Sequence, residues 1–145
     1  SKTLDGASLM RIFLDANVLF SAAKSDGAVR MMVRRLLDAG HECVADEYVV
    51  TEARRNLAAK GPEALTALDV LLVEVNVSKA RAPSMTLKEA NWLPEKDQPV
   101  LYAAMRLKCA ALVTGDRTHF GAAYGKSFGG VTIHSPRSLA EALLY

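Results

Sequence analysis

Apolar residues recur along the chain in two ways, as short runs and as stripes at helical spacing. Apolar side chains at positions 29, 32, 33, 36 and 37 form one stripe, and Gly40 follows it as a helix-ending residue. The short runs end at polar or turn residues, which is typical of buried strands. They predict five strands, over Ile12–Leu14, Cys43–Ala45, Val73–Val77, Ala111–Thr114 and Val131–Ile133.

Helical segments fall between the predicted strands. They are a short turn at Asn17–Ala23 and helices over Ala28–Ala39, from the cap Asp46 to about Ala59, and over Glu63–Leu72, Gln98–Cys109 and Ser135–Leu144. The stretch Lys79–Lys96 has prolines at 83 and 94 and is expected to be mostly loop, and the glycine-rich stretch Phe120–Gly130 to be irregular. This alternation predicts an α/β fold, a three-layer α/β/α sandwich with a central parallel sheet.

The length of 145 residues fits one domain. Residues 1–9 lack an initiating Met and are expected to be an expression remnant or an N-terminal extension, so that residues 10–145 form a single domain. No apolar run can span a bilayer, and no secretory signal is visible. Cys43 and Cys109 show no paired spacing and are expected to be reduced core thiols, which favours a cytoplasmic location.

Charge and aromatic content change the picture little. The 18 basic and 16 acidic residues give a net charge of +2, without the basic surplus of many nucleic-acid-binding domains. Aromatic residues make up 6% of the chain, so base stacking is not expected to be a main source of affinity. His41, His119 and His134 lack zinc-site spacing, and His119 is expected to be a packed or surface histidine. Candidate chemistry therefore rests on carboxylates.

Four acids are expected at one edge of the predicted sheet. Asp15 and Asp116 follow the first and fourth strands, and Glu52 and Asp97 lie on helices that begin on the same side. In open parallel sheets this edge carries the active site. Carboxylates so close together repel one another unless a cation holds them, and acid-only oxygen sites suit Mg²⁺ or Mn²⁺. Such ions activate water and stabilise charge during in-line displacement at a phosphodiester.

Each acid also has a purely structural interpretation. Asp15 and Asp116 are residue types that close turns with their own backbone. Asp97 could be an ordinary N-cap before a proline, and Glu52 could be a solvated surface residue. Taken singly, each structural interpretation is as good as the functional one. The predicted gathering of all four at one edge favours the functional one.

The motifs around these acids resemble those of PIN-domain ribonucleases, which include the VapC-type toxins of toxin–antitoxin pairs. The opening motif is Ile12–Leu19, and Glu52 follows it. Next come Asp97 with the alanine-rich helix Val100–Met105, and then Leu112–Asp116. The four pieces in this order cover nearly the whole chain from Met10. The resemblance implies metal-dependent hydrolysis of single-stranded RNA by an endoribonuclease, with Mg²⁺ or Mn²⁺ as the cofactor.

The same resemblance implies roles and partners. Asp15, Asp97 and Asp116 would be metal ligands, and Glu52 a ligand or the acid that orients the water. Asn17 and Thr114 match positions that commonly form hydrogen bonds around the metal, as supporting residues. A cognate antitoxin and a homodimer are likewise implied, with the helix Ala28–Ala39 as one candidate for the dimer contact.

One segment departs from the pattern of the resembled family. Many members carry a further Asp shortly after the position of Asp116, whereas this chain has Arg117–Phe120 there. Thr118 could hold a metal-bound water but is a poorer ligand than a carboxylate. The departure leaves the number of metal ions open.

Basic residues near the acids are candidates for binding the RNA backbone. Arg117 lies next to Asp116, and Arg54 and Arg55 follow Glu52. A solvated helix face is the default explanation for most such arginines. Arg117 is the exception, because its place beside the acidic centre would neutralise phosphate charge.

Two other functions remain open from the sequence. Asp15–Asn17 is similar to the opening motif of haloacid-dehalogenase-like phosphatases, but Asn17 stands where those enzymes have an acid, and no partner lysine is evident. The second is a PIN-like module that binds RNA or protein without cutting. The presence of all four acids argues against it, and the missing later acid keeps it open.

Overall fold

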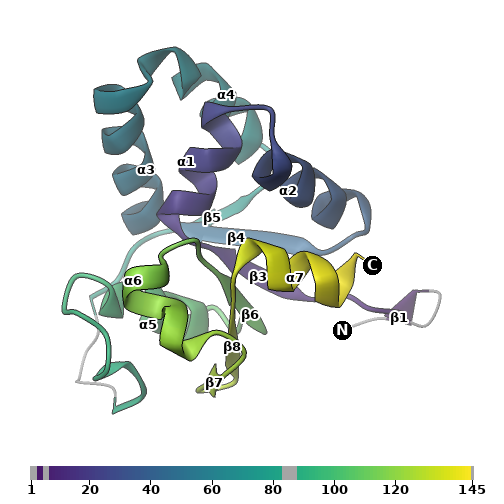
Figure 1. Cartoon of the computed structure of the whole chain (residues 1–145), viewed down its shortest axis with the longest axis vertical. Coiled ribbons are helices and arrows are strands. Elements are labelled where there is room, and N and C mark those ends of the chain that lie inside the picture. The colour runs from purple at the N-terminus through teal and green to yellow at the C-terminus, as the bar shows by residue number, and fades with distance from the viewer. Residues whose placement is uncertain (1–2, 5–6, 83–87, 145) are drawn as a thin grey trace.

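The computed structural model describes residues 3–4, 7–82 and 88–144. Residues 1–2 and 5–6 of the expected N-terminal extension, and residues 83–87 of the expected loop, lie outside the described residues. Figure 1 shows a central sheet with helices on both faces, as the alternating pattern predicts. The three-layer α/β/α architecture is confirmed.

Six strands form the main sheet, in the order β5-β4-β3-β6-β8-β7. All neighbouring pairs are parallel except β7 with β8, which is antiparallel. A separate antiparallel pair, β1 with β2, precedes the sheet. The strands are β1 Thr3–Leu4, β2 Ala7–Ser8, β3 Arg11–Leu14, β4 Glu42–Asp46, β5 Asn76–Ser78, β6 Ala111–Val113, β7 Ser127–Phe128 and β8 Val131–His134.

Helices α1 to α4 gather on one side of the sheet, and α5 and α6 lie on the other (Figure 1). Helix α7 packs against α2 and β8. The α-helices are α1 Ala16–Lys24, α2 Ala28–Asp38, α3 Glu47–Lys60, α4 Leu65–Leu72, α5 Gln98–Arg106, α6 Arg117–Phe120 and α7 Pro136–Leu143. Three short 3₁₀ turns are η1 Pro62–Ala64, η2 Lys88–Ala90 and η3 Gly121–Ala123. None of the helices in the described ranges has the length and apolar character needed to cross a membrane.

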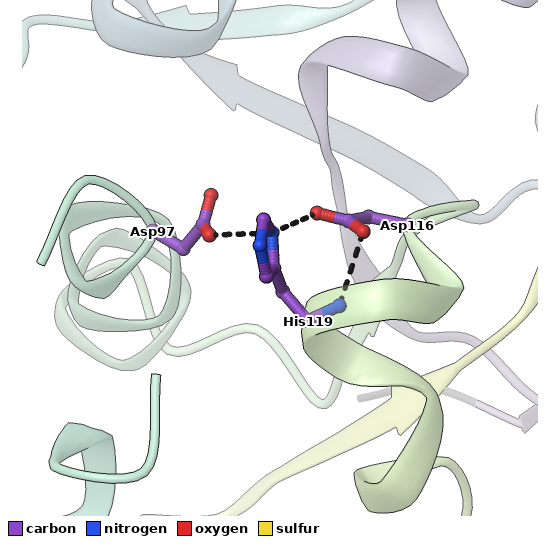
Figure 2. Close-up of side chains that lie close together, drawn as sticks. All are labelled: Asp97, Asp116 and His119. Atoms are coloured by element: carbon purple, nitrogen blue, oxygen red, sulfur yellow. Dashed lines mark hydrogen bonds and ion pairs between the residues drawn. The ribbon is translucent and has the colours of Figure 1, made fainter. Parts of the chain in front are cut away.

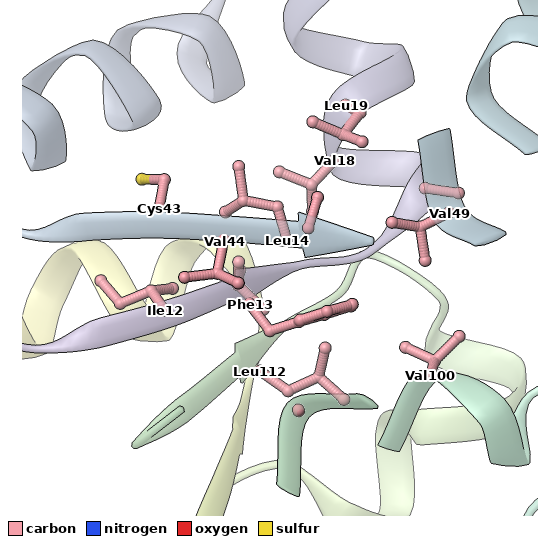
Figure 3. Packing of buried hydrophobic residues seen from close by; sticks show 14 of the residues in the cluster. Ile12, Phe13, Leu14, Val18, Leu19, Cys43, Val44, Val49, Val100 and Leu112 are labelled. Carbon is pink, nitrogen blue, oxygen red and sulfur yellow. The ribbon is translucent and has the colours of Figure 1, made fainter. Parts of the chain in front are cut away.

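Strands at the centre of the sheet are buried on both faces, which explains their continuous apolar runs. Ile12, Phe13 and Leu14 of β3 are fully buried, and Figure 3 shows Val18 and Leu19 of α1 packing close to them. The two cysteines belong to the same core as free thiols, and burial raises the pKa of Cys43 to about 12 and that of Cys109 to about 11.

Polar side chains lie at the junctions where a strand is followed directly by a helix. Asp15 accepts a hydrogen bond from the backbone of Ala16 at the start of α1, and Asp46 caps α3. Ser135 caps α7 in a reciprocal capping box with Ser138. The helices after β3, β4 and β8 therefore begin directly at the carboxyl ends of their strands.

Two local predictions are wrong. The third predicted strand, Val73–Val77, begins only at Asn76, because the chain continues in a helical turn through Val73, whose side chain is 84% exposed. The stretch Phe120–Gly130 is not wholly irregular, since it contains η3 and the edge strand β7. Because β7 pairs antiparallel with β8, the central sheet is mostly parallel. Helix α6 was not expected at all, and it carries part of the candidate site.

Candidate active site

The candidate site lies at the carboxyl ends of β3 and β6, two adjacent parallel strands in the middle of the sheet. After β3 the chain adds β4 and β5 on one side of β3, and it then returns to add β6 on the other side. The direction in which strands are added therefore reverses between β3 and β6. Such a switch point leaves a crevice beyond the strand ends. Asp15 directly follows β3, and Asp116 follows β6 after Thr114 and Gly115.

Three hydrogen bonds hold the buried carboxylate of Asp15. The backbone of Ala16 donates to Oδ1 (2.7 Å), and the Thr114 hydroxyl (2.7 Å) and Asn17 amide (3.2 Å) donate to Oδ2. The Asn17 side-chain carbonyl accepts from the backbone N–H of Gly115 at 2.7 Å. Asn17 and Thr114 therefore join the ends of two strands around the acid, where the sequence places them as supporting residues.

Burial raises the pKa of Asp15 to about 6, from an ordinary value of 3.8. The hydrogen bonds from Thr114 and Ala16 lower it, and the negative charges of Glu52 and Asp97 raise it further. A charge affects a neighbour's pKa in this way only at short range. Glu52 and Asp97, which come from two different helices, thus share one electrostatic neighbourhood with Asp15.

Asp97 stands at the N-cap position of α5 but makes no capping hydrogen bond with its side chain. The Tyr48 hydroxyl on α3 donates to the carbonyl of Lys96 at 2.6 Å and so ties α3 to the residue before Asp97. Burial raises the pKa of Asp97, the charge of His119 lowers it, and the charge of Asp116 raises it. Asp97 therefore occupies the N-cap position, as the structural interpretation expects, but its side chain does not cap the helix and can interact with the other site residues.

Asp116 and His119 meet across the first turn of α6. Asp116 Oδ1 accepts from the backbone of His119 (3.1 Å), and Oδ2 lies 2.8 Å from His119 Nδ1. The same Nδ1 lies 3.0 Å from Asp97 Oδ2, so that the imidazole stands between the two carboxylates (Figure 2). The starts of α5 and α6 thereby converge on one point.

This point has the features of a cation site. Asp97 Oδ2 is buried and finds no hydrogen-bond donor among the residues that the structure describes. An imidazole nitrogen carries at most one hydrogen, and the shorter contact directs it toward Asp116. Asp97, Asp116 and His119 each offer a ligand atom, all within 4.8 Å of one another. A divalent cation would supply the missing partner, so these residues fit the Mg²⁺ or Mn²⁺ expected from the sequence.

Glu52 lies on α3, close enough to Asp15 for its charge to raise the pKa of that acid. It lines an open cavity of about 270 Å³ together with Tyr48, Thr51 and Arg55. Burial raises the pKa of Tyr48, and the charge of Glu52 adds most to that rise, followed by that of Asp97. Glu52 does not belong to the group of three close ligand atoms found within the described ranges.

The candidate RNA-binding residues have different surroundings. Arg54 forms an ion pair with Asp69 of α4 at 2.8 Å, which gives it a structural partner. Arg55 lines the cavity with Glu52, and Arg117 is exposed at the start of α6. Thr118 is also exposed, and its neighbour His119, rather than Thr118 itself, contacts Asp116.

Sequence reasoning missed His119 and Tyr48 as site residues. The expectation of a packed or surface histidine is wrong, because the residue three positions after a helix N-cap folds back onto the cap side chain. The spacing Asp116-x-x-His119 was the available signal, but it is informative only if a helix begins at Arg117. Nothing local to Tyr48 indicates that its hydroxyl reaches Lys96, 48 residues away.

Several solved structures share this fold. VapBC2 from Rickettsia felis, bound to a DNA fragment from its promoter, aligns with a TM-score of 0.62 and 14% identity over 87% of this chain and 98% of that chain. DNA-bound VapBC from Salmonella typhimurium gives 0.60 and 13%, over 88% and 99%. Mycobacterium tuberculosis VapC20, a sarcin-ricin loop cleaving toxin, gives 0.53 and 17%, over 83% and 98%. At these identities the likeness establishes the fold.

The sequence itself gives the family. No curated protein sequence matches the chain significantly. A family model described as the PIN domain matches residues 11–118, which is most of the chain and includes Asp15, Glu52, Asp97 and Asp116. The match agrees with the resemblance carried by the acidic motifs and with the fold of the similar structures. The chain belongs to the PIN domain family.

Proposed function

We propose that this protein is a metal-dependent endoribonuclease that hydrolyses phosphodiester bonds of single-stranded RNA. One observation carries the proposal. Asp97 and Asp116 of a PIN domain converge on a single point, where a buried carboxylate oxygen has no hydrogen-bond donor within the described part of the chain. A carboxylate left in this way favours a bound cation over an empty polar pocket.

In this proposal Asp15, Asp97 and Asp116 hold Mg²⁺ or Mn²⁺, and Glu52 holds the ion or orients the attacking water. The bound ion would activate water and stabilise charge on the phosphodiester during in-line displacement. Three hydrogen bonds fix Asp15 in place, and one oxygen, Oδ1, keeps a lone pair beyond its single bond to the backbone of Ala16. The acid is thus already oriented before any ligand arrives.

The RNA backbone would be bound by basic side chains at the rim. Arg117 is exposed next to Asp116, and Arg55 lines the cavity beside Glu52, so both can reach a phosphate near the acidic centre. Thr118 is exposed on the same helix turn and could hold a water at the rim. Arg54 contributes less, because Asp69 already pairs with it.

We further propose that the protein is the toxin of a toxin–antitoxin pair and acts in the cytoplasm. The shared fold with VapBC complexes from two bacteria and with VapC20 supports an antitoxin partner. A homodimer through α2 is supported by Met31, whose side chain is 55% exposed beside an open cavity of about 520 Å³ between α2 and α7.

A binding module without nuclease activity is the main alternative, because the segment Arg117–Phe120 after Asp116 contains no further acid. Phosphatase chemistry of the haloacid-dehalogenase type has no support. The chain belongs to another family, and Asn17 serves to join Asp15 to Gly115.

An RNA cleavage assay tests the proposal. Single-stranded RNA is incubated with the protein and Mg²⁺ or Mn²⁺, with and without EDTA, beside the variants Asp97→Asn and Asp26→Asn. Asp26 is an acid whose side chain is 88% exposed in the turn between α1 and α2, so its variant controls for the change in charge. We expect cleavage that requires metal, disappears in Asp97→Asn and persists in Asp26→Asn. Metal-dependent RNA binding without cleavage would favour the binding module.

A further inference from the structure

The imidazole of His119 occupies the centre of the acidic site rather than its margin. Its Nδ1 lies 2.8 Å from Asp116 Oδ2 and 3.0 Å from Asp97 Oδ2. Figure 2 shows the ring between the two carboxylates. The His119 side chain is 29% exposed and those of Asp97 and Asp116 are 16% and 26% exposed, so an ion can reach all three groups.

We propose that His119 supplies a nitrogen ligand to the divalent ion and thereby shifts the preference of the site from Mg²⁺ toward Mn²⁺ and Co²⁺. This inference rests on the proposed function, because it concerns the same ion. It adds an imidazole to the carboxylates of the proposed site, so that the ligand set is mixed rather than made of oxygens alone.

The distances fit shared coordination. Adjacent ligand atoms in an octahedral site with bonds of about 2.1 Å lie about 3.0 Å apart, since they subtend a right angle at the ion. The two nitrogen–oxygen distances of 2.8 and 3.0 Å match that spacing. The atoms therefore need little rearrangement to bind one ion in common.

The backbone holds the ring in this position. Asp116 accepts a hydrogen bond from the backbone of His119, which fixes the first turn of α6 next to the carboxylate. The next residue, Phe120, is fully buried and meets the ring of Trp92 edge to face, with 5.9 Å between centroids. A ligand held by a packed neighbour loses little entropy on binding a metal.

The donor atoms decide the preference among ions. Carboxylate oxygens suit Mg²⁺ and Mn²⁺ alike, whereas a neutral imidazole nitrogen binds Mg²⁺ poorly and favours ions further along the first transition series. A site with Asp97, Asp116 and His119 should therefore bind Mn²⁺ more tightly than Mg²⁺, and Co²⁺ more tightly than Mn²⁺.

A second role for His119 is compatible with the same contacts to Asp97 and Asp116. The ring could act only as a hydrogen-bonded bridge that orients the two carboxylates. An asparagine can form that bridge through its amide nitrogen but can offer an ion only an oxygen. His119→Asn therefore separates ligation from bridging.

Pulsed electron paramagnetic resonance of bound Mn²⁺ tests the proposal without reference to activity. Imidazole bound through nitrogen gives a hyperfine coupling to that nitrogen. We expect the coupling in the wild-type protein, its loss in His119→Asn, and its persistence in His134→Asn. His134 is a matched control, because its Nδ1 contacts Ser138 on α7 instead of an acid.

Calorimetric titration with Mg²⁺ and Mn²⁺ gives a second measurement. The ratio of Mn²⁺ to Mg²⁺ affinity should fall by roughly tenfold in His119→Asp, which restores an oxygen donor. Bound Mn²⁺ without nitrogen coupling in the wild type, or coupling that survives in His119→Asn, would overturn the role of His119 and leave the proposed nuclease intact. No Mn²⁺ binding by the wild type would overturn both.

Discussion

The acidic site has two halves, a strand side around Asp15 and a helix side around Asp97, and the two differ in how their carboxylates are hydrogen-bonded. On the strand side, every oxygen of the Asp15 carboxylate accepts a hydrogen bond, and Thr114 behind it is fully buried. On the helix side, Asp97 makes no capping bond, and its buried Oδ2 lacks a donor among the described residues. The protein alone supplies the hydrogen bonds of Asp15, whereas in the proposed function a cation would supply the missing partner of Asp97.

The two acids therefore have different roles in the proposed site, since hydrogen bonds orient the Asp15 carboxylate and the Asp97 oxygen is available to a cation. Hydrogen bonds that orient a carboxylate are made once, during folding, and stabilise the ends of β3 and β6. A buried carboxylate oxygen without a donor, such as Oδ2 of Asp97 among the described residues, lowers the stability of the folded chain unless a cation binds it. We therefore expect substitutions of the residues that hold Asp15 to act mainly on stability, and substitution of Asp97 to act mainly on activity.

The largest expected effect is the loss of cleavage in Asp97→Asn. A bound ion supplies several kcal/mol of transition-state stabilisation, so the rate should fall by at least about 10³-fold. The free energy of unfolding without metal should stay within about 0.5 kcal/mol of the wild-type value, because the loss of attraction to His119 is offset by removal of a buried charge and of its repulsion with Asp116. Urea unfolding followed by the fluorescence of Trp92, the only tryptophan, measures the stability. A large loss of stability would erase the distinction between the halves.

The next effect concerns pH and Asp15. Its pKa is about 6 in the folded protein against an ordinary 3.8, so the folded state keeps a proton in this interval that the unfolded state has released. Stability from this group is therefore full below pH 3.8 and falls as the pH rises toward 6, by about 3 kcal/mol in all. Urea unfolding between pH 4 and 7 in EDTA measures the slope.

The control for this slope is Asp15→Asn, which cannot titrate. His41 and His134 have lowered pKa values and act in the opposite direction near pH 6, but their contributions are common to both proteins. The difference between wild type and variant isolates Asp15. Parallel curves would show that the pKa of Asp15 is the same in the folded and unfolded protein, so that its hydrogen bonds cancel the effect of its burial.

The sequence predicts the parts of this comparison that depend on periodicity. The runs at β3, β4 and β6 are buried on both faces, so their apolar character marks them to within a residue or two, and β8 shows the alternation of a strand with one buried face. β7 pairs over only two residues, which is too short for any periodic signal. β5, at the edge of the sheet, begins at Asn76 and not at the predicted Val73, because Val73 still belongs to the helical turn that ends α4.

The site follows the same division. The gathering of Asp15 and Asp116 follows from parallel strand ends, and the nearness of Glu52 and Asp97 from helices that begin at that edge. His119 enters through α6, a helix of four residues that propensity does not reveal. The orphaned oxygen of Asp97 is a property of packing in three dimensions, and no pattern in the chain encodes it.

A smaller effect is expected from Thr114→Val on the strand side. The substitution keeps the shape of a fully buried side chain and removes the hydroxyl that donates to Asp15 Oδ2 at 2.7 Å. A lost hydrogen bond to a charged group costs about 2 kcal/mol, and the pKa of Asp15 should rise further. Thr114→Ser keeps the hydroxyl and should leave that pKa unchanged. Equal pH profiles for the two variants would contradict this.

The smallest effect concerns arginines at the rim of the site. One of them already has an acidic partner, and another is exposed beside the site. Arg54 already pairs with Asp69, whereas Arg117 is exposed next to Asp116. In the inactive Asp97→Asn background, Arg117→Gln should weaken binding of single-stranded RNA roughly fourfold near physiological salt, since each phosphate contact contributes about 0.7 to the salt slope. Fluorescence anisotropy over a range of salt concentrations measures both quantities. Arg54→Gln should change neither, and an equal loss from both variants would mean that the ion pair with Asp69 opens to bind RNA.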